Sequence, residues 1–241
     1  GSAYGLDSIE SVRRLLGFMK EAGYQVDFIP EDTEAFMKRL TAQATNDRSM
    51  LTEEQEAACQ KVPKKLYCDL FATFPEETRR QMEKDWGKAP GRVMTTESGD
   101  ILVPGLMDGH IFLTVQAPRG YGFDAAKIYH DPFIAPTHQY LAYYQWIRDV
   151  WGADAVVHVG THGNLEWLPG KSTGMDRGSY PDLALGSLPN DKSSPHQSQT
   201  RPPPAARGKY ARCRRHHSHT ADHSPYASLA GPRSQHRARP H

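Results

Sequence analysis

Residues 138–160 read "HQYLAYYQWIRDVWGADAVVHVG" and join a helix pattern directly to a strand pattern. Thr137 is placed to cap the helix, because a threonine oxygen can accept a hydrogen bond from the first turn. An apolar stripe at helical spacing follows, formed by Tyr140, Leu141, Tyr144, Ile147 and Trp151. The run "DAVVHVG", residues 154–160, is typical of a buried strand. A repeated helix-then-strand pattern indicates an α/β protein, so we expect helices packed on a mostly parallel sheet.

The rest of the first 190 residues carries the same two patterns. Residues 7–21 have the pattern of an amphipathic helix, with Asp7 and Glu10 as a capping box. Further helices are expected at residues 31–43, 53–61 and 76–86, and strands at residues 24–30, 101–105 and 110–116. A Gly- and Pro-containing break near residue 90 separates a helix-rich α/β segment, residues 1–88, from a second α/β segment, residues 89–190.

Residues 191–241 differ from the rest in composition. They carry ten Lys and Arg against two Asp and no Glu, although the whole chain has a net charge of only +1. They contain one Leu, seven of the chain's twelve His and seven Pro. This small number of apolar residues cannot form a buried core. We therefore expect a low-complexity basic tail that is disordered. Its cations are scattered, which argues against nucleic-acid binding.

Cysteine usage and hydropathy indicate the cellular setting. The three cysteines, Cys59, Cys68 and Cys213, form no Cys-x-x-Cys pair, so neither a disulfide framework nor a zinc knuckle is predicted. A reducing, cytoplasmic location is the resulting expectation. The sequence has no apolar run of the roughly 18 residues that a membrane-spanning helix needs, so no membrane span is expected.

The motif "VVHVGTHGNLEWLPGKST", residues 156–173, ends like a phosphate-binding loop. Such a loop needs a glycine five residues before Gly170, and Leu165 occupies that position. The glycines and proline that follow the motif also disfavour the helix that should cap the phosphates. We therefore expect that this loop does not bind a nucleotide.

The same motif carries candidate metal ligands. His158, His162 and Glu166 are spaced four residues apart, and they follow a buried-strand pattern into a turn. The carboxyl end of a strand is where ligands bind in open α/β sheets, so the three side chains could converge on a ligand there. The alternative is a half-buried histidine beside a surface histidine, with no shared ligand.

Residues 117–136, "APRGYGFDAAKIYHDPFIAP", have turn chemistry throughout and predict an ordered loop that presents side chains. Arg119, His130 and Asp131 are its candidate ligand-facing residues. An exposed His-Asp-Pro turn without a ligand explains the same composition equally well.

Several segments resemble the CobN/magnesium-chelatase large-subunit family, in family order. They are "YGLDSIESVRRLLGFMKEAGYQVD", "WGKAPG", "VQAPRGYGFDAAKIYHDPFIAPTHQYLAYYQWIRD", "DAVVHVGTHGNLEWLPGK" and "SYPDLALGSLPN", which together cover roughly residues 1 to 190. The resemblance implies insertion of a divalent metal into a tetrapyrrole, an intact protein several times longer, and ATP hydrolysis by separate AAA-type ATPase subunits. "THGNLEWLPGK" is closer to the cobalt branch of cobalamin synthesis than to the magnesium branch.

Metal insertion gives the motif residues a role. The reaction must strip water from the ion and accept two protons from the pyrrole N–H groups, and both histidine and glutamate can do this. The resemblance therefore implies that His158, His162 and Glu166 form the metal-binding and catalytic cluster, with Glu166 essential. The implied substrate-binding residues are Arg119 and Lys171 for peripheral carboxylates, Trp167 and Tyr121 for stacking on the macrocycle, and His130.

The family pattern stops after Asn190, where the sequence continues "DKSSPHQSQTRPPPAARGKYARCRRHHSHT". Codons for Arg-Arg-His-His, read one base later, can encode Val or Ala twice and then Ile or Thr twice. We therefore predict that residues from about 191 onward are an out-of-frame translation, or an equivalent sequencing artefact, and that the isolated chain lacks activity.

Three other functions remain open from sequence alone. A magnesium chelatase subunit acting on protoporphyrin is the first. A non-catalytic module that binds a tetrapyrrole or a metal is the second. An independent metallohydrolase is the weakest, because the helical His-Glu-x-x-His arrangement is absent from the sequence.

Overall fold

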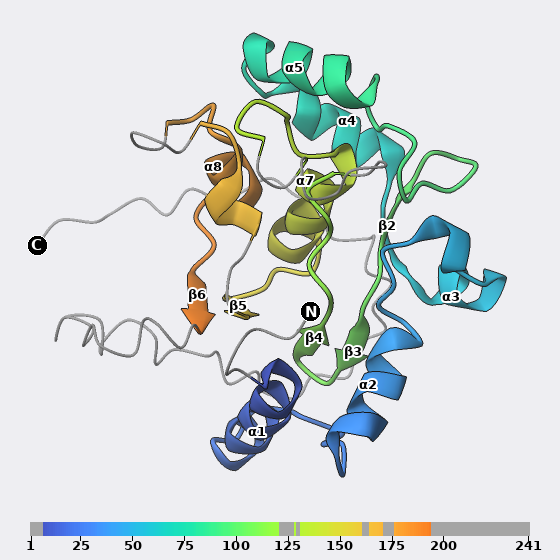
Figure 1. The fold of residues 1–241 in the computed structure, drawn as a ribbon, viewed down its shortest axis with the longest axis vertical. Helices are drawn as coiled ribbons and strands as arrows, with labels where there is room; N and C mark the ends of the chain where they lie inside the picture. The colour runs from blue at the N-terminus through green and yellow to red at the C-terminus, as the bar shows by residue number, and fades with distance from the viewer. Residues whose placement is uncertain (1–6, 121–127, 129–130, 161–163, 171–175, 194–241) are drawn as a thin grey trace, which may run out of the picture. The chain divides into compact units, whose positions relative to one another are not determined.

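A computed structural model describes residues 7–120, 128, 131–160, 164–170 and 176–193 of the chain (Figure 1). The helices are α1 (Ser8–Glu21), α2 (Thr33–Thr41), α3 (Glu53–Ala58), α4 (Lys64–Ala72), α5 (Glu76–Trp86), α7 (His138–Gln145) and α8 (Tyr180–Leu185). Two short 3₁₀ helices are η1 (Arg48–Met50) and η3 (Asn164–Trp167). The strands are β1 (Gln60–Val62), β2 (Ile101–Val103), β3 (Leu106–Asp108), β4 (Ile111–Leu113), β5 (Val156–Val159) and β6 (Asn190–Ser193).

The strands of the described residues form three separate pairs, so the expectation of a mostly parallel sheet is wrong. Strands β1 and β2 pair antiparallel, as do β3 and β4, and only β5 and β6 pair parallel. A tight turn at Gly109, whose φ is +59°, joins β3 to β4, and so short a connection permits only an antiparallel pair. The parallel pair has the long connection that it requires, since residues 160–189 separate β5 from β6. The mixed α/β class itself is confirmed.

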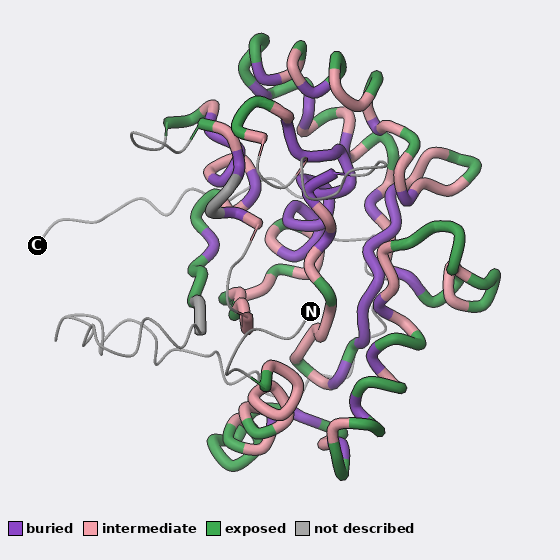
Figure 2. Tube along the Cα trace, in the orientation of Figure 1, coloured by how far each residue is buried: buried purple, intermediate pink, exposed green. Residues whose placement is uncertain are grey.

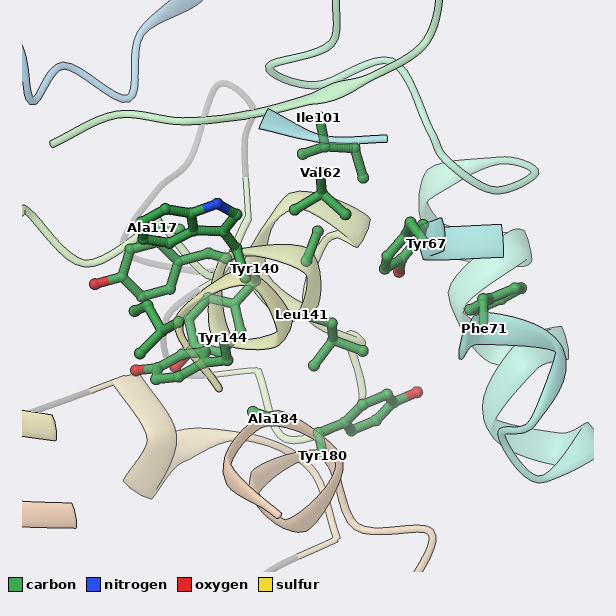
Figure 3. Packing of buried hydrophobic residues seen from close by; sticks show 14 of the residues in the cluster. Val62, Tyr67, Phe71, Ile101, Ala117, Tyr140, Leu141, Tyr144, Tyr180 and Ala184 are labelled. Atoms are coloured by element: carbon green, nitrogen blue, oxygen red, sulfur yellow. The ribbon is translucent and has the colours of Figure 1, made fainter. Parts of the chain in front are cut away.

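Helix α7 lies at the centre of the largest hydrophobic core. All eight of its residues are buried, so the predicted apolar stripe understates how far it is enclosed (Figure 2). The helix packs between β2 and α8, as Figure 1 shows. Its Tyr140, Leu141 and Tyr144 point into a cluster with side chains from four other elements (Figure 3). Each large apolar side chain buried there contributes about 1.5–3 kcal/mol to folding.

A π-helical turn, Trp146–Val150, continues α7 where the sequence predicts a regular helix. The backbone N–H of Trp151 donates to the carbonyl oxygen of Trp146 at 2.8 Å, a spacing of five residues. The two indole rings stack with centroids 6.0 Å apart and planes 2° apart. The wider turn therefore places both rings on the same side of the helix end.

The predicted helix caps are present in the structure. Asp7 accepts a hydrogen bond from the Glu10 N–H at 2.9 Å, and Thr137 accepts one from the Tyr140 N–H at 3.1 Å. The Glu10 carboxylate contacts Arg13 instead of closing a capping box, with a shortest distance of 2.6 Å to its Nε. The helices predicted at residues 7–21 and 76–86 are confirmed, and the cap at Asp7 is half of the predicted box.

Two predicted element assignments are wrong, and one helix was missed. Residues 24–30 form no strand, because isolated hydrogen bonds take the place of a ladder to a neighbouring strand. The Phe28 N–H donates to the Asp108 carboxylate at 3.1 Å, and the Gln25 carbonyl accepts from the His110 N–H at 3.1 Å. The helix predicted to end at residue 61 ends at Ala58, and residues 60–62 form β1. Helix α4 was not predicted at all.

The described helices include none that is long and apolar enough to cross a membrane. The tail predicted to be disordered comprises residues 191–241. Residues 191–193 belong to β6, and residues 194–241 lie outside the described residues.

Candidate functional site

The site is built around His158, which lies in β5. Its imidazole is half-buried, and its Nε2 lies 3.1 Å from the hydroxyl oxygen of Tyr144 on α7. The two rings meet edge to face, with centroids 6.2 Å apart. Strand β5 thus places one predicted site residue directly against the central helix of the core.

Gln116, three residues beyond the end of β4, connects this pair to the motif. Its Nε2 donates to the hydroxyl oxygen of Tyr144 at 2.6 Å and to that of Tyr140 at 3.2 Å. Its Oε1 accepts a hydrogen bond from the backbone N–H of Asn164 at 3.1 Å. The Gln116 side chain therefore connects the segment after β4 to helix α7 and to the start of η3 through hydrogen bonds.

The hydroxyls of Tyr144 and Tyr143 stay protonated near neutral pH. Burial raises the pKa of Tyr144 far above its ordinary value, and hydrogen bonds from neighbouring side chains oppose this only partly. Burial likewise raises the pKa of Tyr143, the next residue of α7. Both side chains therefore act as neutral hydrogen-bonding groups.

His158 and Gln116 line a largely apolar cavity of about 430 Å³ between α1, β4 and β5. Side chains from α1 and from the end of the π-helical turn, among them Val12, Leu16 and Trp151, form much of its wall. A few polar side chains in the wall of an apolar cavity are the usual composition of a ligand site.

The predicted convergence of His158, His162 and Glu166 is not tested by the structure. The backbone of Glu166 lies in η3, between the buried residues Leu165 and Leu168, but its side chain and the whole of His162 lie outside the described residues. Within the described part of the chain, no group of three or more His, Cys, Asp or Glu side chains could hold a metal ion. The metal cluster stays a prediction.

Arg119 is fully buried rather than exposed on the loop. Its guanidinium donates to the carbonyl oxygen of Ile134 at 3.0 Å and to that of Asp131. Its own carbonyl oxygen accepts from the N–H of Thr137 at 3.2 Å. In this structure Arg119 holds the loop against the start of α7, and its contact with a substrate carboxylate stays a prediction.

The Asp131 carboxylate also organises this loop. Its Oδ1 accepts from the N–H groups of Phe133 at 2.7 Å and Ile134 at 3.2 Å, which is an Asx turn. The other predicted loop residues, His130 and Tyr121, lie outside the described residues.

The end of the motif is anchored to α8. Ser179 Oγ lies 2.9 Å from the carbonyl oxygen of Gly170 and 3.0 Å from Asp176 Oδ1, and its single proton can be donated to either oxygen. The Asp176 carboxylate accepts the backbone N–H of Gly178, which together with the Ser179 hydroxyl holds the pKa of that carboxyl below its ordinary value. Lys171 lies outside the described residues, as does the side chain of Trp167, so their substrate contacts are untested.

Sequence reasoning missed Gln116 and the polar role of Tyr144. Tyr144 was assigned only to the apolar stripe of its helix, and Gln116 only to the end of a strand. A tyrosine hydroxyl needs a partner when buried, which was the one available signal. The partner itself is distant in sequence and only the fold reveals it.

Comparison with known proteins identifies the family. The CobN/Magnesium Chelatase family model matches residues 1–191. The chain therefore belongs to the CobN/magnesium chelatase family, as the sequence segments predict. A solved structure, the catalytic subunit of cobaltochelatase from Mycobacterium tuberculosis, superposes with a TM-score of 0.69 at 39% identity, covering 80% of this chain and 16% of that one.

Curated relatives give the same family. An uncharacterized protein of Methanocaldococcus jannaschii is 46% identical over 190 residues, which are 78% of this chain and 15% of the relative. The aerobic cobaltochelatase subunit CobN of Pseudomonas aeruginosa is 38% identical over 79% of this chain and 15% of its own length. The magnesium-chelatase H subunit of Chlorobaculum parvum is 34% identical over 77% of this chain and 14% of its own. The chain thus spans about 15% of the length of these relatives.

Proposed function

We propose that the chain is part of the large subunit of an ATP-dependent chelatase that inserts cobalt into a corrin precursor. The observation that carries the proposal is its 38% identity to a cobaltochelatase subunit, together with its likeness to the catalytic subunit of another cobaltochelatase. The alternative is a magnesium chelatase subunit acting on protoporphyrin, which the 34% identity to a magnesium-chelatase subunit supports. The alternative to both enzymes is a module that binds a tetrapyrrole or a metal without inserting it.

The chemistry of insertion assigns roles to the motif. The ion must exchange water for protein ligands, and two pyrrole protons must be accepted before the ring nitrogens can bind it. In the proposal, His158, His162 and Glu166 supply these ligands and proton acceptors, because imidazole and carboxylate can do both near neutral pH. Glu166 is the proposed essential residue.

The remaining roles in the proposal concern the macrocycle and the energy source. Arg119 and Lys171 bind peripheral carboxylates, while Trp167 and His130 contact the ring. ATP is hydrolysed by AAA-type ATPase partner subunits in the cytoplasm, since the motif lacks the glycine that a phosphate loop needs at position 165.

A spectroscopic titration tests substrate binding and the cobalt branch together. The whole chain is titrated with a hydrogenobyrinic-type tetrapyrrole and, separately, with a metal-free porphyrin, and absorbance is recorded. We expect binding of the first, weakened by His162→Ala or Glu166→Gln and unchanged by Glu97→Gln, a matched change of an exposed glutamate. Preference for the porphyrin would support the magnesium alternative, and equal binding by all variants would remove the motif from the substrate site.

Catalysis requires a second experiment in the full-length large subunit assembled with its ATPase subunits. Glu166→Gln should abolish metal insertion while tetrapyrrole and metal still bind. Normal insertion by this variant with normal metal affinity would show that Glu166 is not the essential residue. Ring binding by the native subunit without any metal incorporation would favour the non-catalytic binding module.

A further inference from the structure

The two amide atoms of Gln116 can be told apart from its partners. A backbone N–H can only donate, so the atom 3.1 Å from Asn164 N must be the carbonyl oxygen of the side chain. The other atom is then the NH₂ group, and it must donate to the hydroxyl oxygens of Tyr144 and Tyr140. The usual ambiguity of a glutamine side chain is thereby removed.

This assignment bears on the direction of the next bond. Because the Tyr144 oxygen accepts from Gln116, its single proton is available to the two other groups in contact with it, the imidazole of His158 and the hydroxyl of Tyr140. His158 Nε2 lies 3.1 Å from that oxygen, and an imidazole nitrogen is a stronger acceptor than a phenol oxygen. Tyr144 is 0% exposed, so water does not compete for the proton.

We propose that Gln116 and Tyr144 are positioning residues that hold the imidazole of His158 with Nε2 as hydrogen-bond acceptor and the ring proton on Nδ1. The same glutamine holds the N–H of Asn164, two residues before Glu166. The chain of bonds thus sets the ring of His158 and the start of η3 relative to one another. The role of His158 in metal insertion rests on the proposed function. The hydrogen bonds that orient its ring do not depend on that function.

The arrangement has a chemical consequence for the motif. While Tyr144 donates to Nε2, that nitrogen is engaged, and an ion could bind it only by displacing the hydroxyl. A hydrogen bond to one ring nitrogen of a histidine sets which nitrogen carries the proton. Loss of either partner should therefore alter the tautomer of His158 without removing the histidine.

The tautomer can be read directly by NMR. The whole chain is labelled with ¹⁵N-histidine, and long-range ¹H–¹⁵N spectra are recorded at pH 8, with His158→Gln identifying the signal of His158. We expect an unprotonated Nε2 and a protonated Nδ1, the reverse of the tautomer that predominates in free histidine. A protonated Nε2 in the native chain would overturn the proposed direction of the bond.

Two variants and a control separate positioning from general stability. Tyr144→Phe should shift His158 toward the Nε2–H tautomer, whereas Tyr143→Phe, a matched change of the neighbouring buried tyrosine, should leave it unchanged. An unchanged tautomer in Tyr144→Phe would sink the proposal. If Tyr144→Phe does not fold, as judged by circular dichroism, Gln116→Met is used instead. Gln116 is only half-buried, and the change removes the hydrogen bond that it donates to Tyr144.

The link to η3 has its own measurement. Gln116→Met should make the amide hydrogen of Asn164 exchange roughly tenfold faster, since one hydrogen bond is lost. Unchanged exchange at Asn164 would refute the coupling. Failure of tetrapyrrole binding with the native tautomer and exchange pattern intact would reject the proposed function alone.

Discussion

At the residue scale, the hydrogen-bond partners of the buried His138 define its tautomer. Its Nε2 lies 2.9 Å from the carbonyl oxygen of Gly87, which can only accept, so Nε2 carries the proton. Its Nδ1 lies 2.9 Å from the hydroxyl of Tyr67 and therefore accepts. Both bonds suit a neutral ring. Burial lowers the pKa of His138 below its ordinary value of 6.5, although the bond to Gly87 opposes this.

We therefore predict that the free energy of unfolding decreases as the pH is lowered below 6.5. The unfolded chain binds a proton at His138 in this range and the folded chain does not, so the free energy of unfolding decreases as the pH drops from the unfolded pKa toward the folded one. Urea midpoints at pH 7.5, 6.5 and 5.5 measure this. His138→Gln should flatten the slope, and His110→Gln, a change of an exposed histidine, should retain it. Equal slopes in all three proteins would contradict the prediction.

Two glycines with similar backbones offer a second prediction. Gly109 and Gly152 have φ values of +59° and +73°, so alanine at either adopts a left-handed conformation that costs about 1–2 kcal/mol. A Cβ at Gly109 would also collide with the carbonyl oxygen of Gln25, whereas one at Gly152 would meet nothing within 4 Å. Gly109→Ala should therefore lower the free energy of unfolding, measured in urea, by clearly more than Gly152→Ala. Equal losses would mean that the turn relaxes without cost.

At the scale of elements, Thr137 is the cap on which α7 depends. Its side-chain oxygen accepts from the Tyr140 N–H at 3.1 Å, and the residue is 1% exposed. Thr137→Ala removes this bond and should lower the free energy of unfolding by about 1 kcal/mol. Thr41→Ala is the matched control, since that exposed hydroxyl donates back into its own helix, to Met37. A control variant that loses as much stability as Thr137→Ala would show that capping is not the cause.

The elements that the sequence predicts correctly are those with local signals. Asp7 and Asp32 each cap a helix by bonding a residue three positions later, and such a signal is visible in a short window. Helices α4 and α5 both begin after a proline without a side-chain cap, but only α5 has acidic residues in its first turn, so the start of α4 gave no such signal. Residues 24–30 alternate like a strand, but their partners are the side chain of Asp108 and one backbone N–H, which no window reveals.

Strand pairing and the site depend on contacts between distant residues. β1 pairs with β2 about forty residues later, and strands of three residues carry too little pattern to predict orientation. Similarly, the motif pointed to His158, but its partners Tyr144 and Gln116 became evident only once the fold placed them beside it. The residue types of the motif suggest a chemistry that stays a prediction, and they gave no indication of the hydrogen-bonding network around His158.

At the scale of the whole molecule, the chain carries one family-like part and one part of different composition. The family match covers residues 1–191, and the chain spans about 15% of the length of its relatives. The out-of-frame origin of the remaining residues stays a prediction, which resequencing the gene would test. An intact reading frame through this region in the gene would count against it.

The composition of the tail also makes a prediction about folding. Residues 194–241 contain one Leu and no Ile, Val, Phe, Met or Trp, so they can bury almost no apolar surface. The dependence of unfolding free energy on urea scales with the surface that unfolding exposes. A chain ending at Ser193, where β6 ends, should therefore match the complete chain in both urea midpoint and slope. A smaller slope after truncation would mean that the tail folds, and a lower midpoint at equal slope would mean that it stabilises the family-like part. Agreement in both quantities would show that residues 1–193 account for the measured stability. These residues include β5 and α7, which place His158 beside Tyr144.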